Sequence, residues 1–108
     1  MPKKTLRKKK DIDQVFTAGL SFYCPILGLK VLKNNLDHNR YGIVIGLKVS
    51  KSAVVRNKIK RQIREVIRRE FPQTDTFYDI VIIVIKEIVD KEFLDIKKEL
   101  LNLAKKIK

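Results

Sequence analysis

The sequence predicts an α+β fold, an α/β sandwich in which helices pack on a small four-stranded mixed sheet in the order α-β-β-β-α-β-α. Two observations support this fold class. Apolar residues recur at helical spacing in three segments, and between these segments lie short apolar runs with strand character. A length of 108 residues has room for one domain, which we expect to span residues 1–108. Residues 1–10 carry six basic residues and no acidic one, and are expected to form a basic arm that can be flexible.

A short helix is predicted to follow this arm. Asp11 can cap it, and Ile12, Val15 and Phe16 are spaced to share one helical face. Gly19 is placed where the helix should end, because glycine is common just after the last turn.

Three strands are expected next. Residues 21–33 have strand character, but Pro25 cannot donate a hydrogen bond to a sheet, so we expect a short strand, a break and a second strand over about 26–32. Turn-forming polar residues fill positions 34–39. The strand over 41–49 is predicted to pair antiparallel with its predecessor in a long hairpin.

The second half of the chain predicts a long helix, a buried strand and a final helix. Ser52 can cap a helix that runs to about Glu70, and Pro72 should end it because proline disfavours helix in the preceding residue. Residues 78–85 are almost all apolar, which is typical of a strand covered on both faces. Asp90 is predicted to cap the last helix.

The positive charge is concentrated in the first two-thirds of the chain. The sequence has 25 Lys and Arg against 12 Asp and Glu, a net charge of +13. Residues 1–70 hold 18 basic and 5 acidic residues, whereas residues 71–108 hold 7 of each. A concentrated positive charge is typical of a surface that binds a polyanion, and it favours nucleic acid over a membrane surface as the partner.

The long helix carries the densest part of this charge. From Lys48 to Arg69 there are nine basic residues and one acid, Glu65. A solvated helix would place Glu three or four positions from its cations, so the uncompensated charges at positions 56, 60 and 64 favour an external anion. Guanidinium groups match phosphate oxygens in pairs. The predicted RNA-binding residues of this helix are Arg56, Asn57, Lys58, Lys60, Arg61, Arg64 and Arg68.

Part of this helix resembles the Arg-Asn-Arg signature of the protein subunit of bacterial ribonuclease P, the enzyme that matures the 5′ ends of tRNA. The matching run is Arg56-Asn57-Lys58-Ile59-Lys60-Arg61, followed by Ile63-Arg64. The first-helix region is similar as well, through Leu6-Arg7, Asp11 and Val15-Phe16-Thr17-Ala18-Gly19. With length, charge and element order, the resemblance covers almost the whole chain.

The chain departs from the family pattern at three places. Lys58 stands where the family usually has a second arginine, which keeps the charge and loses the guanidinium fork. The run Ser50-Lys51-Ser52 replaces a turn that often contains glycine. Leu27 stands where an aromatic residue is frequent on the central strand.

The resemblance implies that catalysis belongs to a large RNA, on which magnesium ions perform the phosphodiester hydrolysis. The protein is then a cytoplasmic subunit of an endoribonuclease, without catalytic residues or a tightly bound metal of its own. Its partners are the catalytic RNA, docked by the basic helix, and the 5′ leader of precursor tRNA. No membrane and no obligate protein partner is expected. The leader enters a cleft between the first helix and the sheet, and the residues implied there are Phe16, Lys48, Phe22, Tyr23 and Lys51.

The resemblance also implies a left-handed crossover from the third strand through the basic helix to the fourth, a rare connection. Three other functions stay open. A ribosomal protein or RNA chaperone would share the charge and the fold type. A DNA-binding module would need an exposed recognition helix or a dimer element. A nuclease acting alone would need histidine or clustered carboxylates, and the one histidine, His38, lies in a polar turn.

Overall fold

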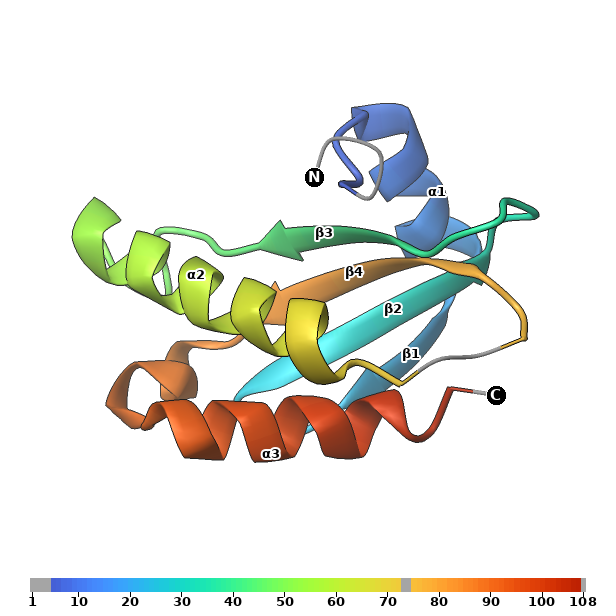
Figure 1. Cartoon of the computed structure of the whole chain (residues 1–108). Helices are drawn as coiled ribbons and strands as arrows, with labels where there is room; N and C mark the ends of the chain where they lie inside the picture. The colour runs from blue at the N-terminus through green and yellow to red at the C-terminus, as the bar shows by residue number, and fades with distance from the viewer. Residues whose placement is uncertain (1–4, 73–74, 108) are drawn as a thin grey trace.

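The computed structural model describes residues 5–72 and 75–107, which fold into helices packed on a four-stranded sheet (Figure 1). In chain order the elements are α1 (Lys9–Ala18), β1 (Leu20–Tyr23), β2 (Leu27–Lys33), β3 (Arg40–Val44), α2 (Ala53–Glu70), β4 (Tyr78–Val84), the 3₁₀ helix η2 (Lys86–Asp90) and α3 (Phe93–Ala104). The predicted α+β class and the α-β-β-β-α-β-α order are confirmed, and the break around Pro25 separates β1 from β2 as expected.

The strands lie in the order β1-β2-β4-β3. β2 pairs antiparallel with β1 and with β4, whereas β3 pairs parallel with β4. The predicted hairpin between the strands at 26–32 and 41–49 is therefore wrong, because β4 is inserted between them. β4 is suited to the central position since its apolar side chains can be buried on both faces, while β3 ends early, at Val44, and lies at the edge.

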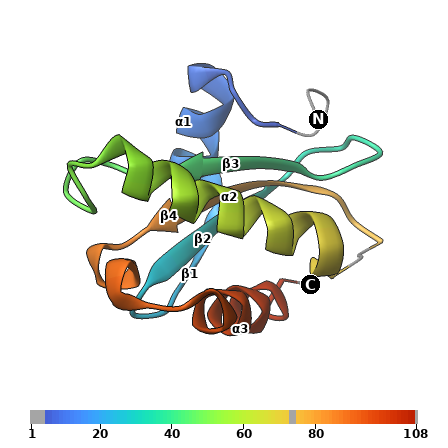
Figure 2. The same ribbon diagram turned by 60° about the vertical axis from the view of Figure 1, so that its left-hand side comes forward.

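The connection from β3 to β4 passes through α2 on one face of the sheet, and both views show the same course (Figures 1 and 2). Followed along the chain, this crossover is left-handed, as the family resemblance implies. Almost all parallel connections are right-handed, so the order of residues alone would favour the opposite hand.

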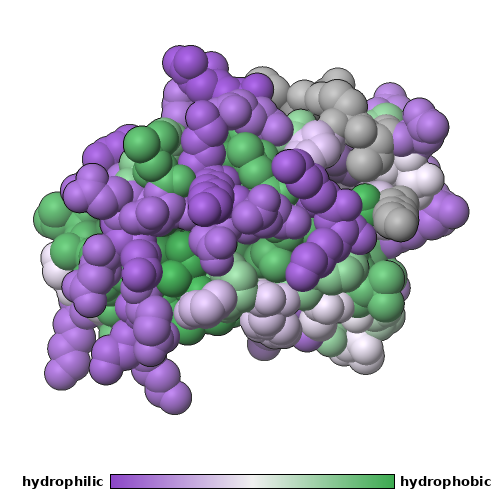
Figure 3. Space-filling view, turned by 90° about the horizontal axis from the view of Figure 1, so that it is seen from below, coloured by the Kyte–Doolittle hydropathy of each residue, from purple (hydrophilic) through white to green (hydrophobic). Residues whose placement is uncertain are grey.

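α2 and α3 cover this face of the sheet and enclose the main core. Side chains alternate along β4, so Ile80 and Ile82 enter this core. The fully or nearly fully buried residues that face them from the helices are Ile59, Ile63, Val66, Ile96, Leu100 and Leu103. Seen from the side of α3, the surface is largely hydrophilic, with apolar areas between projecting side chains (Figure 3). Among the described residues no helix is long and apolar enough to cross a membrane.

α1 covers the other face of the sheet with a smaller cluster. Leu6, Val15 and Val81 are buried there, and Ile12 and Ile83 pack against them. This single short helix leaves part of the face beside β1 accessible, since Ser21 and Tyr23 are exposed. The two faces thus differ in what covers them, and the face on the side of α1 is partly open.

The described part of the basic arm, residues 5–10, contacts the edge of the sheet and enters α1. The backbone N–H of Leu6 donates to the carbonyl oxygen of Tyr41 at 2.7 Å, and Thr5 forms a parallel bridge with the same residue. Lys9 and Lys10 already belong to α1. Thr5 and Leu6 are thus attached to the edge of β3, and the flexibility of the arm stays a prediction. Residues 1–4 lie outside the described residues.

Two of the three predicted helix caps are wrong. Asp11 lies inside the first turn of α1, whose N-cap position is Lys8, and its carboxylate faces Arg40. Asp90 ends η2, and α3 begins three residues later at Phe93. Glu92 is the N-cap residue of α3, and its backbone N–H donates to the carboxylate of Asp95 at 3.3 Å.

The predicted cap of α2 is confirmed. The hydroxyl oxygen of Ser52 accepts a hydrogen bond from the backbone N–H of Val55 at 3.3 Å. The helix ends at Glu70, before Phe71 and Pro72. All its boundary signals are local, which is why the sequence predicts this element closely.

Candidate nucleic-acid interface

The apolar residues of α2 determine which of its side chains face outward. Ile59, Ile63 and Val66 are buried against the sheet and α3. At 100° per residue, the opposite side of the helix carries, within an arc of about 100°, a stripe of polar and basic residues. This α2 stripe consists of Asn57, Lys60, Arg61, Arg64 and Arg68.

Among the described residues, ion pairs neutralise the C-terminal end of the α2 stripe. Arg68 donates to both carboxylate oxygens of Glu65, at 2.9 and 3.0 Å, and Arg69 donates to the same carboxylate. The hydrogen bonds from these two arginines lower the pKa of Glu65 below its ordinary value of 4.5. Among the residues that the structure describes, Lys60, Arg61 and Arg64 have no ion-pair partner.

Arg56 differs from the other predicted cations of the helix. Its side chain is half-buried, and its guanidinium Nη1 donates to the carbonyl oxygen of Ser50 at 2.8 Å. The contact braces the turn that leads into α2. Arg56 therefore supports the start of the helix, while Lys58 is exposed on its flank.

A second cationic surface lies between α1 and the open face of the sheet. Phe16 remains 40% exposed, and the Lys30 ammonium lies 5.5 Å from the centroid of its ring, within the range of a cation–π interaction. The same ammonium donates to the hydroxyl oxygen of Ser21 at 2.8 Å. The Lys30 ammonium is thus held between Ser21 of β1 and the ring of Phe16 of α1.

Tyr23 extends this surface along β1. It pairs with Gly28 across the strands and is 53% exposed. A Cβ at position 28 would lie 2.4 Å from the Tyr23 ring, so the absence of a side chain there leaves room for the ring beside β2. We call Phe16, Tyr23, Lys30 and Ser21 the aromatic platform.

The structure separates the residues predicted to bind the leader. Phe16 and Tyr23 both belong to the open face, whereas Phe22 is paired with Leu29 and packs against the main core on the opposite face. Because neighbouring strand residues point to opposite sides, Phe22 and Tyr23 cannot share one binding surface. Lys48 and Lys51 are exposed in the connection from β3 to α2.

Sequence reasoning missed Lys30 and Ser21. The signal for Lys30 was its place in β2, where a lysine stands between the buried Leu29 and Val31. A single cation inside an apolar strand points to the face opposite its neighbours. Its proximity to Ser21 depends on the pairing of β1 with β2, which could not be read from composition.

An α+β sandwich with a basic helix on one side and an aromatic, cationic platform on the other has the features of a class: small nucleic-acid-binding proteins. Comparisons with known proteins identify the family. The family model for ribonuclease P matches residues 1–108.

Relatives and solved structures agree with this match. The ribonuclease P protein component of Clostridium botulinum (strain 657 / Type Ba4) is 39% identical over 107 residues, which cover 98% of this chain and 96% of that protein. The RNase P protein of Thermotoga maritima is 33% identical, with a TM-score of 0.85 and 96% and 97% of the two chains covered. The Staphylococcus aureus RNase P protein is 29% identical, with a TM-score of 0.85 and 97% and 95% covered. The chain belongs to the ribonuclease P protein family, and it is a subunit of the ribonucleoprotein that matures tRNA 5′ ends.

Proposed function

We propose that the chain docks on the catalytic RNA of ribonuclease P through the α2 stripe, and that the aromatic platform binds the single-stranded 5′ leader of precursor tRNA. The observation that supports this division is the placement of the two surfaces on opposite sides of one sheet. α2 covers the face with the main core, and Phe16, Tyr23 and Lys30 lie on the other face.

The α2 stripe suits a folded RNA. Three of its cations have no ion-pair partner among the described residues, so binding to phosphates replaces water and counterions rather than existing ion pairs. The helix is packed against the core by its buried residues, which fixes the backbone from which the guanidinium groups project. Contacts of this kind depend on the course of the RNA backbone and need no base sequence.

The aromatic platform suits an unpaired strand. Bases that are not stacked in a duplex can stack on the exposed rings of Phe16 and Tyr23, and a cation between them can follow the backbone. Stacking on an aromatic ring contributes about 1–3 kcal/mol per base and tolerates any base. We therefore propose weak sequence preference in the leader, with Lys48 and Lys51 as additional phosphate contacts.

In this proposal the RNA performs the hydrolysis in the cytoplasm, with magnesium ions held mainly by RNA phosphates. The described residues contain no cluster of three or more histidine, cysteine or acidic side chains, so no step is assigned to a metal on this chain. The contribution of the protein is affinity and orientation of the substrate.

Two sets of variants test the division of labour. Arg61→Ala with Arg64→Ala should weaken binding to the ribonuclease P RNA and leave the preference for leader-bearing over mature tRNA unchanged. Tyr23→Leu and Phe16→Leu should reduce that preference, by roughly five-fold or more for each lost stacking contact, and leave RNA-subunit affinity unchanged. Both affinities can be measured by titration of labelled RNA.

Each set has a matched control. Lys105→Ala with Lys106→Ala removes the same charge from exposed positions just after α3, and should change neither affinity beyond a general salt effect. Phe22→Leu alters the neighbour of Tyr23 on the opposite face and should leave leader preference intact. The division is refuted if the two sets weaken both affinities by the same factor.

A further inference from the structure

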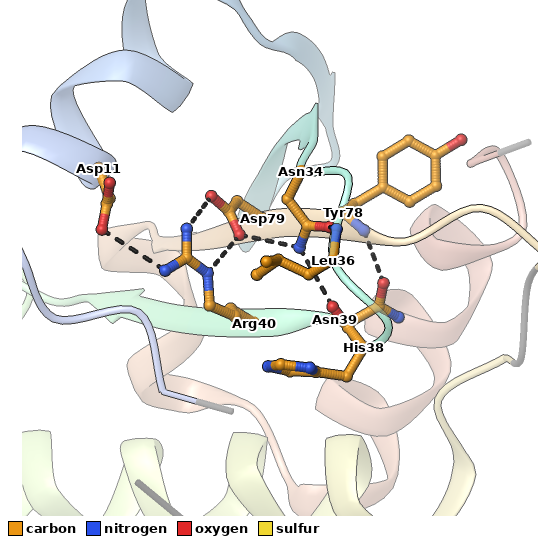
Figure 4. Close-up of polar contacts among 8 residues, drawn as sticks. All are labelled: Asp11, Asn34, Leu36, His38, Asn39, Arg40, Tyr78 and Asp79. Carbon is orange, nitrogen blue, oxygen red and sulfur yellow. Dashed lines mark hydrogen bonds and ion pairs between the residues drawn. The ribbon is translucent and has the colours of Figure 1, made fainter. Parts of the chain in front are cut away.

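A network of charged and polar side chains joins α1 to β3 and β4 (Figure 4). At its centre is Asp79, at the start of β4, which is 6% exposed and is the one charged residue buried among those the structure describes. The Arg40 guanidinium donates to it through Nε at 2.7 Å and through Nη2 at 2.6 Å. Asn34 adds a third hydrogen bond, at 3.0 Å.

This arrangement holds Arg40 in one orientation. A bidentate arginine–carboxylate pair fixes the plane of the guanidinium, and the buried carboxylate cannot turn away without losing its partners. The hydrogen bonding of the Arg40 guanidinium to the carboxylate of Asp79 is the main reason that the pKa of Arg40 is raised. The remaining nitrogen, Nη1, is directed out of the sheet toward α1.

Asp11 of α1 meets that nitrogen. Its carboxylate lies 3.5 Å from Arg40 Nη1, and both side chains are 25% exposed. At 100° per residue, Asp11 and Phe16 lie about 140° apart around α1, on either side of the buried Val15. The ion pair therefore holds one flank of the helix, and the contact between Phe16 and Lys30 lies on the other flank.

We propose that Asp11 and Arg40 are positioning residues for the leader site. Arg40, which is held by Asp79, sets the rotation of α1 about its own axis through the ion pair with Asp11. This rotation sets the distance between Phe16 and Lys30. The inference rests on the proposed binding of the leader at the aromatic platform. Val15 lies between the two flanks and is fully buried against the sheet, so α1 would rotate about this contact.

Electrostatics and positioning predict opposite signs for the same substitution. Loss of an acidic residue near an RNA site should strengthen binding to a polyanion, since it removes repulsion. Loss of the Asp11 carboxylate should instead weaken leader binding, if its role is to hold α1. Asp13 provides the matched control, because it is exposed on the same helix and has no ion-pair partner among the described residues.

The experiment compares Asp11→Asn with Asp13→Asn in the protein assembled with the ribonuclease P RNA. We expect Asp11→Asn to reduce the preference for leader-bearing over mature tRNA by about two- to five-fold, the range of a partly exposed ion pair, at unchanged RNA-subunit affinity. Asp13→Asn should leave the preference unchanged or raise it. If both variants raise it, or neither changes it, the positioning role is refuted.

A second measurement uses the free protein and does not depend on leader binding. The Phe16 ring should shift the NMR signals of the Lys30 ε-protons, and Asp11→Asn should reduce this ring-current shift, whereas Asp13→Asn should not. An unchanged shift in Asp11→Asn refutes the proposal even if leader binding falls. If the shift is reduced but Phe16→Leu does not alter leader preference, the positioning holds and the proposed leader site fails.

Discussion

Gly19 joins α1 to β1 at a point where no side chain fits. A Cβ at this position would lie 2.5 Å from the carbonyl oxygen of Val15 and 2.7 Å from that of Val31. Both oxygens belong to the backbone, so a side chain could be accommodated only by moving α1 away from β2. The residue ends the helix as predicted, but the reason is this close approach, since its φ of −80° is open to any residue.

We expect Gly19→Ala to lower the free energy of unfolding by about 1–3 kcal/mol, the usual cost of forcing extra atoms into a packed site. Urea denaturation measures this. Gly46→Ala is the control, because the nearest atom to its Cβ would be 4.0 Å away. There the substitution should be neutral or stabilise by up to about 1 kcal/mol, through a less flexible unfolded chain. Equal losses at both positions would contradict the packing argument.

Tyr41 gives the fold a dependence on alkaline pH. Burial raises the pKa of its hydroxyl above the ordinary 10.0, against the smaller opposing effect of the hydrogen bond from Asn39. Above about pH 10 the folded state then binds more protons at this residue than the unfolded state, so this contribution to stability is lost as the pH rises through the folded pKa.

Tyr41→Phe should remove this loss. Because the lysines also titrate in the same range, the measured quantity is the difference in unfolding free energy between wild type and variant, from pH 8 to pH 11. We expect the wild type to lose more stability than the variant above about pH 10. If the unfolding free energies of wild type and variant change in parallel with pH, the Tyr41 hydroxyl titrates alike in the folded and unfolded states, and the prediction is wrong.

At the scale of elements, α2 combines a buried apolar side with a cationic one, and Glu65 is the residue that limits its charge. Its carboxylate pairs with Arg68 and Arg69. Since the pKa of Glu65 is lowered, these pairs persist above its ordinary value of 4.5 and are lost as the pH falls below it. At neutral pH, two of the arginines of the helix are thus partly neutralised before RNA arrives.

Glu65→Gln should therefore tighten binding to the ribonuclease P RNA at low salt. It should also steepen the slope of log K against log salt, by roughly 0.7–0.9 for each additional phosphate contact. The control is Glu87→Gln, which changes the charge equally on the exposed η2 helix. If the two substitutions act alike, net charge alone matters and the stripe has no special role.

The elements differ in how far the sequence predicts them. α2 was predicted almost to the residue because Ser52, the apolar spacing and Pro72 are all local signals. The pairing of β3 was not, because its partner β4 lies more than thirty residues later in the chain and is inserted between β2 and β3. The predicted caps at Asp11 and Asp90 are wrong for different reasons: Asp11 is engaged by Arg40, a residue of β3, whereas Asp90 ends η2 and Glu92 is the N-cap residue of α3.

At the scale of the whole molecule, the α2 stripe and the aromatic platform are predictable from the sequence to different degrees. The α2 stripe follows from helical periodicity and composition. The aromatic platform depends on strand register, which places Tyr23 on the open face and Phe22 in the core, and on the β1–β2 pairing that brings Lys30 to Ser21. Its residues come from α1, β1 and β2, so it could be only partly foreseen from Phe16 and Tyr23.

The central claim is that the chain assists an RNA catalyst and performs no hydrolysis itself. The most direct test is cleavage of a leader-bearing precursor tRNA at low magnesium, with a bacterial ribonuclease P RNA alone, this protein alone, and the two together. We predict rapid formation of the mature 5′ end only in the mixture. Cleavage by the protein alone would contradict the claim. Tight RNA binding without stimulation would also contradict it, and would favour a ribosomal or chaperone role.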